Sequence, residues 1–133
     1  MIIRRRHTGA PIKAKDIPLS EHAIQATLVA ILEHKLRPGV VMFSVPNGGL
    51  RQMRVAIKLK SEGSAAGMPD LGFAFEGGRV IWLEIKNAKG RLSDVQIGMH
   101  QKLKNLGHVV GLAKSVDEAL IFLGTHGLFA RAA

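Results

Sequence analysis

Apolar residues recur at helical spacing near the start of the chain. Ser20 is a good N-cap, and the Pro-Gly pair at 38–39 ends the segment that follows it. The positions expected on the buried stripe are Ala23, Ile24, Thr27, Leu28, Ile31 and Leu32. This spacing predicts a helix. Glu21 falls between Ile24 and Leu28 on the helical wheel, so we expect its carboxylate on or beside the stripe, although the helix dipole alone also favours an acid in the first turn.

Two short apolar segments in the middle of the chain predict a β-hairpin. They are residues 71–75 and 80–85, and residues 76–79 join them with the sequence Glu-Gly-Gly-Arg. A short connection containing glycines is typical of a hairpin. Asp70 stands just before the first strand, while Glu84 and Lys86 stand near the end of the second. Because the two strands run antiparallel, we expect all three side chains at one edge of the hairpin.

The spacing of two between Glu84 and Lys86 places them on one face of the strand, and Trp82 shares that face. Two carboxylates in a mostly apolar setting repel each other and are costly to bury, so a pair such as Asp70 and Glu84 usually needs a cation. Hard oxygen ligands suit Mg²⁺ or Mn²⁺, and a neighbouring lysine can hold a phosphate or orient a metal-activated water. The alternative is a solvent-facing Glu84–Lys86 ion pair, which would be weak.

The remaining elements follow from short patterns along the chain. Residues 40–45 predict a strand, and a Pro-Asn-Gly-Gly turn leads to a helix at 50–61 with Leu50, Met53 and Ile57 on its apolar face. After the hairpin, Ser93 and Gln96 form a capping box for a helix whose expected apolar face is Val95, Met99, Leu103 and Leu106. Residues 108–113 predict a strand, and Ser115 caps a last helix. This order predicts an α/β fold with a small mixed β-sheet flanked by helices.

Composition points to a basic, single-domain protein. The 133 residues contain 19 Lys and Arg against 10 Asp and Glu, a net charge of +9, which favours a polyanionic partner and nucleic acid first. We expect a basic arm at 1–18 and one domain at 19–133. There is no cysteine, no membrane-spanning apolar run and no signal-peptide core, so we expect a cytoplasmic protein without disulfides or a membrane partner.

Basic residues near the two predicted turns are candidate phosphate contacts. Arg51, Arg54 and Lys58 share a face of the 50–61 helix, and Lys89 and Arg91 lie in a basic glycine turn after the hairpin. A solvated basic face is the alternative for the helical set. His100 lies one turn beyond Gln96, and we expect it at the surface or beside the site rather than as a metal ligand, because no second histidine stands at ligand spacing.

The order of these residues resembles the PD-(D/E)XK nuclease superfamily, which has a restriction-endonuclease-like core. An acid lies on the first helix, Pro69-Asp70 opens the hairpin, Glu84-Ile85-Lys86 closes it, and Gln96 lies on the next helix. Within the superfamily, three longer stretches over residues 20–123 resemble the VRR-NUC domain of virus-type replication and repair nucleases. They are Pro-Asn-Gly-Gly at 46–49, Gly-Met-Pro-Asp-Leu at 67–71, and Leu-Glu-Ile-Lys-Asn-Ala-Lys-Gly-Arg-Leu-Ser-Asp-x-Gln at 83–96.

The resemblance implies a Mg²⁺- or Mn²⁺-dependent DNA endonuclease that needs no small-molecule cofactor. Asp70, Glu84 and the Ile85 carbonyl would be the metal ligands, and Lys86 would position or help to deprotonate the attacking water. Glu21 matches the family's first-helix acid and Gln96 its later polar residue. Asn47 lies in the matching turn and is expected to line the site.

Stand-alone members of the family are similar in activity to Holliday-junction resolving enzymes and act as homodimers, so the resemblance implies a homodimer acting on branched DNA. The candidate dimer surfaces are the outer face of the first helix and the C-terminal residues Leu123, Leu128 and Phe129; alternatively, these three fold back onto the core. The other functional hypotheses are a nicking or restriction-like enzyme, a nuclease acting on RNA, and a DNA-binding module of the same fold that has lost cleavage.

Overall fold

The computed structural model describes residues 19–46 and 53–131. The expected basic arm and the expectations for Asn47, Leu50 and Arg51 lie outside these residues. The chain forms, in order, α1 (Glu21–Lys35), β1 (Val41–Ser44), α2 (Met53–Ser61), β2 (Leu71–Phe75), β3 (Arg79–Ile85), α3 (Asp94–Asn105), β4 (Val109–Ala113) and α4 (Val116–Thr125). This is the order of elements expected from the hydrophobic pattern.

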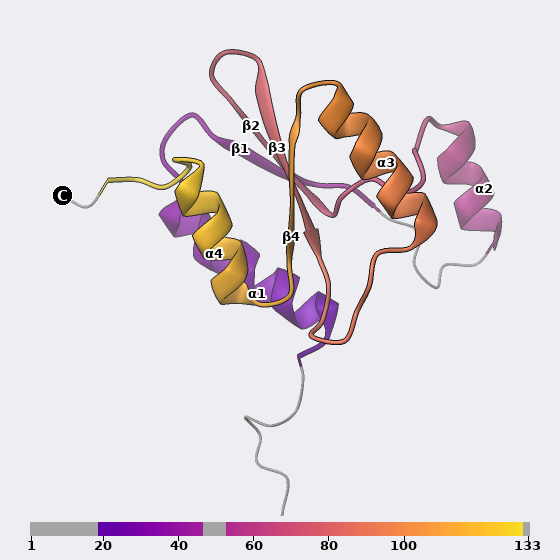
Figure 1. Ribbon diagram of the computed structural model, residues 1–133, viewed down its shortest axis with the longest axis horizontal. Helices are drawn as coiled ribbons and strands as arrows, with labels where there is room; N and C mark the ends of the chain where they lie inside the picture. The colour runs from indigo at the N-terminus through magenta and orange to yellow at the C-terminus, as the bar shows by residue number, and fades with distance from the viewer. Residues whose placement is uncertain (1–18, 47–52, 132–133) are drawn as a thin grey trace, which may run out of the picture.

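The four strands form one mixed sheet in the order β1-β2-β3-β4. β1, β2 and β3 pair antiparallel, and β4 pairs parallel with β3. The hairpin register sets Leu71 opposite Leu83, so Asp70 at the start of β2 lies beside the end of β3. Figure 1 shows α1 and α4 on one side of the sheet and α3 on the other, with α2 at the edge of the molecule beyond α3. The prediction of an α/β fold with a mixed sheet flanked by helices is confirmed.

The hydrophobic core lies between the sheet and the layer formed by α1 and α4. Alternate residues of β2 and β3 point into it because successive side chains of a strand face opposite ways. They meet one stripe of α1, the inner face of α4 and the segment after it. The core includes Leu71, Phe73, Ile81, Leu83, Ile85, Ile24, Leu28, Leu32, Leu123 and Leu128.

The C-terminal segment folds back onto this core. Leu123 and Leu128 are fully buried, and Phe129 packs against the buried cluster while its backbone bridges to Leu36. The expectation that these three residues form a dimer surface is therefore wrong. The physical reason is that Leu123 lies on the buried face of α4, and that Gly127, with φ 74°, turns the chain back after α4 so that Leu128 and Phe129 return to the core.

Two other expected apolar faces differ from the structure. In α3, Val95 is 58% exposed and Leu106 is 76% exposed, whereas His100 is only 5% exposed and is buried with Leu103. The helix therefore presents the Gln96–His100–Leu103 side to the sheet, because the strand face beneath it carries polar Glu84. In α2, Ile57 is 62% exposed, so the expected apolar face is not buried at this position.

Within residues 19–46 and 53–131, none of the helices is long and apolar enough to span a lipid bilayer.

Candidate active site

Asp70 and Glu84 converge at the end of the hairpin where β3 finishes. The backbone N–H of Ile85 donates a hydrogen bond of 2.8 Å to Asp70 Oδ2, which holds this carboxylate against β3. The Asp70 carbonyl accepts from the N–H of Val45, so the residue is also tied to the strand β1 side of the sheet. Hydrogen bonds to Ile85 of β3 and to Val45, which follows β1, thus hold Asp70 beside Glu84.

Glu84 is buried on the α3 side of the sheet, with 1% of its surface exposed. Gln96 Nε2 donates to Glu84 Oε1 at 3.1 Å, and Lys86 Nζ lies 3.8 Å from the same oxygen. Lys86 is two residues further along the chain and on the same face, as the strand period requires. The structure therefore brings Asp70, Glu84, Lys86 and Gln96 into one cluster.

The pKa of Glu84 is raised from its ordinary 4.5 to about 8, first by burial and then by the neighbouring Asp70 carboxylate. The Lys86 ammonium lowers this pKa, but by less than the combined effect of burial and Asp70. Without a cation, Glu84 is thus mostly protonated at neutral pH. A bound cation would favour the ionised form.

Glu21 reaches the edge of this cluster from the first turn of α1. A Cβ built on Gly90 would lie 3.1 Å from Glu21 Oε1 and 3.1 Å from Lys86 Cβ, so the basic turn after β3 passes tightly between the two side chains. The Glu21 charge also raises the pKa of Glu84. The first-helix acid therefore lies near the hairpin end.

Helix α3 is anchored so that Gln96 faces Glu84. Ser93 Oγ accepts from the N–H of Gln96, and Gln96 Oε1 accepts from the N–H of Ser93, which completes the predicted capping box while leaving Nε2 for Glu84. Gly67 supports the same turn from the other side. A Cβ there would lie 2.6 Å from the Val95 carbonyl oxygen, so only glycine allows the loop before Asp70 to approach α3 this closely.

His100, expected at the surface or beside the site, is buried beside Glu84. Its Nε2 lies 3.6 Å from Glu84 Oε2, and both atoms are buried without a hydrogen-bond partner among the described residues. Burial lowers the pKa of His100, so the imidazole is neutral near pH 7 and this contact is not an ion pair. The available signal was its spacing of four from Gln96, which places both on one helical face.

The expected DNA contacts are only partly described. Lys58 in α2 and Lys89 and Arg91 in the turn after β3 are exposed. Asn47, Arg51 and the side chain of Arg54 lie outside the described part of the structure. The charged groups of these three residues are therefore accessible.

The donor set at the hairpin end fits a hard divalent cation. Glu84 Oε2 is a buried carboxylate oxygen that no described protein donor satisfies, and Asp70 supplies a second carboxylate beside it. The described residues contain no group of three or more His, Cys, Asp or Glu that could hold a metal. A cation here would instead use the two carboxylates with the Ile85 carbonyl and water, which is the oxygen-rich, partly hydrated coordination typical of Mg²⁺.

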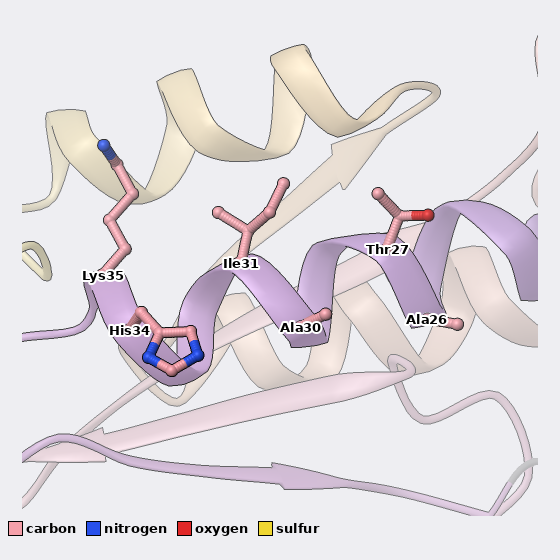
Figure 2. Close-up of a pocket in the computed structure, with 6 residues that line it drawn as sticks. All are labelled: Ala26, Thr27, Ala30, Ile31, His34 and Lys35. Carbon is pink, nitrogen blue, oxygen red and sulfur yellow. The ribbon is translucent and has the colours of Figure 1, made fainter.

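A hollow of about 820 Å³ lies elsewhere, on the outward face of α1 (Figure 2). It is open and mostly apolar, and Figure 2 shows Ala26, Ala30 and Ile31 along it, with His34 and Lys35 at the C-terminal end of the helix. It contains none of the residues of the carboxylate cluster. The hollow and the carboxylate cluster are therefore separate features of the structure.

The four-stranded mixed sheet flanked by helices is a VRR_NUC-like α/β fold. The chain matches the solved structure of a protein described as "VRR_NUC domain protein" with a TM-score of 0.65 and 20% sequence identity, over 81% of this chain and 88% of the other. It matches a second, described as "VRR_NUC domain", with a TM-score of 0.54 and 16% identity, over 82% of this chain and 99% of the other. No family model and no curated protein matches the sequence. The chain thus has the fold of VRR_NUC domain proteins.

Proposed function

We propose that this protein is a metal-dependent nuclease that hydrolyses phosphodiester bonds of DNA. The observation that carries the proposal is the convergence of Asp70 and Glu84 beside Lys86 at the end of β3, with the buried oxygen Glu84 Oε2 lacking a protein donor. The VRR_NUC-like fold supports the same reading.

Asp70, Glu84 and the Ile85 carbonyl would hold Mg²⁺ or Mn²⁺. A divalent ion bound there stabilises charge on a phosphate and makes water nucleophilic near neutral pH. Gln96 keeps the Glu84 carboxylate oriented through its hydrogen bond to Oε1. Lys86 would orient the attacking water as an ammonium, or take up its proton as the neutral amine, since Nζ lies 3.8 Å from Glu84 Oε1 and so stands beside the metal ligands. Glu21 would support the cluster from α1.

Recruitment of DNA would fall to the basic surface. The net charge of +9 favours a polyanion, and the exposed Lys58, Lys89 and Arg91 are available to phosphates. We place the catalytic activity in one domain at 19–133 and assign the same recruiting role to the basic arm at 1–18, together with Asn47, Arg51 and Arg54.

The test compares Asp70→Asn and Glu84→Gln with the wild type in a DNA cleavage assay containing Mg²⁺ or Mn²⁺. Both variants keep the shape of the side chain but remove a charged ligand, so we expect cleavage to fall to background while circular dichroism stays unchanged. Glu76→Gln is the matched control, because Glu76 is an exposed carboxylate at the other end of the hairpin, where it pairs with Arg37. A folded Asp70 or Glu84 variant that cuts DNA at the wild-type rate would contradict the proposal.

We further propose that the protein acts on branched DNA as a homodimer. One site of this kind cuts one strand, and converting a four-way junction into two duplexes requires two symmetric cuts, which a two-fold dimer supplies. With Leu123 and Leu128 buried inside the protomer, the remaining candidate interface is the exposed outer face of α1, where small apolar side chains would allow close packing (Figure 2).

The dimer is tested by light scattering and by cleavage of junction, flap, linear duplex and RNA substrates. We expect a mass of two chains at micromolar concentration and preferential cutting of the junction. Ile31→Glu should yield a monomer that loses junction resolution, whereas Leu106→Glu, a change of the exposed leucine that caps the C-terminus of α3, should leave both the mass and junction cutting unchanged. A wild-type monomer that resolves junctions fully would refute this part of the proposal.

A further inference from the structure

Two buried polar atoms face each other in the carboxylate cluster without a hydrogen bond. Glu84 Oε2 and His100 Nε2 are 3.6 Å apart, and neither atom has a hydrogen-bond donor or acceptor among the described residues. A buried polar atom without a hydrogen-bond partner lowers the stability of the folded state. A closure of about half an ångström would bring this pair within ordinary hydrogen-bond distance.

Two donors near Glu84 come from one face of α3, in addition to Lys86 Nζ, which follows β3. Gln96 and His100 are four residues apart, so their side chains lie one above the other on the helix. Gln96 Nε2 is 3.1 Å from Oε1, and His100 Nε2 is 3.6 Å from Oε2. Each carboxylate oxygen is therefore opposite a different α3 side chain.

This arrangement leaves room for a cation on the same carboxylate. Each oxygen of an ionised carboxylate has two lone pairs, so a donor from α3 can occupy one while the other remains for a metal. Residues that hold a ligand in this way typically contribute a factor of about 10–100 to metal affinity.

We propose that His100 is a positioning residue that, together with Gln96, holds both oxygens of Glu84 in the orientation that binds a divalent cation. The inference rests on the proposed function, because it assigns Glu84 as a metal ligand. His100 acts through Glu84 by donating its Nε2–H to Oε2, and it does not itself bind the metal. At 5% exposure it lies between α3 and the sheet rather than at the open edge of the site.

The experiment titrates Mn²⁺ into the full chain by calorimetry in the absence of DNA. His100→Phe keeps a planar ring but removes the donor, and we expect it to weaken Mn²⁺ binding by about 10–100-fold. His100→Gln restores an N–H donor without an imidazole, so its dissociation constant should return to within about threefold of the wild type if hydrogen bonding is what matters. In cleavage assays the Mn²⁺ concentration for half-maximal rate should rise with His100→Phe, while KM for DNA stays the same.

His108→Phe is the matched control. His108 Nδ1 accepts a 2.8 Å hydrogen bond from Trp82 Nε1, so this change also removes a part-buried histidine and its hydrogen bond, but near the opposite end of β3. We expect it to lower stability without changing Mn²⁺ affinity. If His100→Phe does not fold by circular dichroism, His100→Met replaces it with the same expected results.

Wild-type Mn²⁺ affinity in a folded His100→Phe variant would overturn the inference and leave the proposed function intact. A His100→Gln variant as weak as His100→Phe would also overturn it, because that pattern indicates direct ligation by the imidazole. A wild-type chain that neither binds Mn²⁺ nor cuts DNA would overturn the proposed function itself.

Discussion

Replacing Glu84 by Gln should change how the stability of the metal-free protein depends on pH. The wild-type side chain has a folded-state pKa of about 8 against an ordinary value of 4.5, so the folded protein keeps a proton that the unfolded chain has already released. Between these two values the folded state binds more protons, and stability must fall as pH rises. This contribution is fully present below pH 4.5 and is lost as pH rises through about 8.

The size of the effect follows from the shift. Moving a carboxyl pKa from 4.5 to about 8 corresponds to about 5 kcal/mol once the group is ionised in both states. The free energy of unfolding of a domain of this size is only about 5–15 kcal/mol, so the metal-free wild type should be much weaker at pH 9 than at pH 5. Gln96 and Lys86 can still contact a glutamine at position 84, but that glutamine does not ionise.

The assay is urea unfolding at several pH values from 4.5 to 9 in a chelating buffer, for the wild type and Glu84→Gln. All other titrating groups are shared, so the difference between the two curves isolates residue 84. We expect Glu84→Gln to gain stability over the wild type progressively above pH 5, reaching a few kcal/mol by pH 9. Adding Mn²⁺ at pH 8 should then stabilise the wild type but not the variant. Parallel pH profiles for the two proteins would refute the reasoning about the burial of Glu84.

Three further predictions concern the neighbourhood of the site. Lys86→Ala should lower kcat far more than it weakens DNA binding. It removes only one of 19 basic residues from the DNA-binding charge, but it removes the only lysine of the described cluster. An equal loss in cleavage rate and in DNA affinity, measured by single-turnover cleavage and fluorescence anisotropy, would contradict its assigned role. Neutralising Arg51, Arg54 and Lys58 together should flatten the dependence of log K on log salt by up to about three phosphate equivalents, and an unchanged slope would move the DNA surface elsewhere. Gly67→Ala should destabilise the protein by about 1–3 kcal/mol in thermal unfolding, since Gly67 has φ 81° and packs against the first turn of α3; an unchanged midpoint would show that the loop relaxes freely.

Local sequence determined where the helices and the hairpin form and that Asp70 lies near the end of β3. The serine caps at 20, 93 and 115 each accept the expected backbone hydrogen bond, and the Gly-Gly connection forms the turn between β2 and β3. The approach of Asp70 to the end of β3 was also predictable, because a tight hairpin fixes which residues lie opposite each other within a few positions. These features depend on neighbours close in the chain, so the pattern alone was sufficient.

Only the tertiary structure decided which side chains of one helix or strand contact those of another. Apolar periodicity favoured Val95 and Leu106 as the buried face of α3, yet the helix turns Gln96 and His100 inward, because the strand face beneath it carries Glu84. The full burial of Glu84, and with it the raised pKa, arises from α3 covering β3, and no local pattern encodes that contact.

The C-terminal residues show the same limit. An apolar stretch near a terminus fits a dimer surface or a return to the core equally well on sequence grounds. The core of α1 and the sheet, formed by residues far away in the chain, supplied the site that buries Leu123 and Leu128. Long-range packing of this kind decided which surfaces remain free, because burial depends on what lies opposite a side chain and not on the residue type alone.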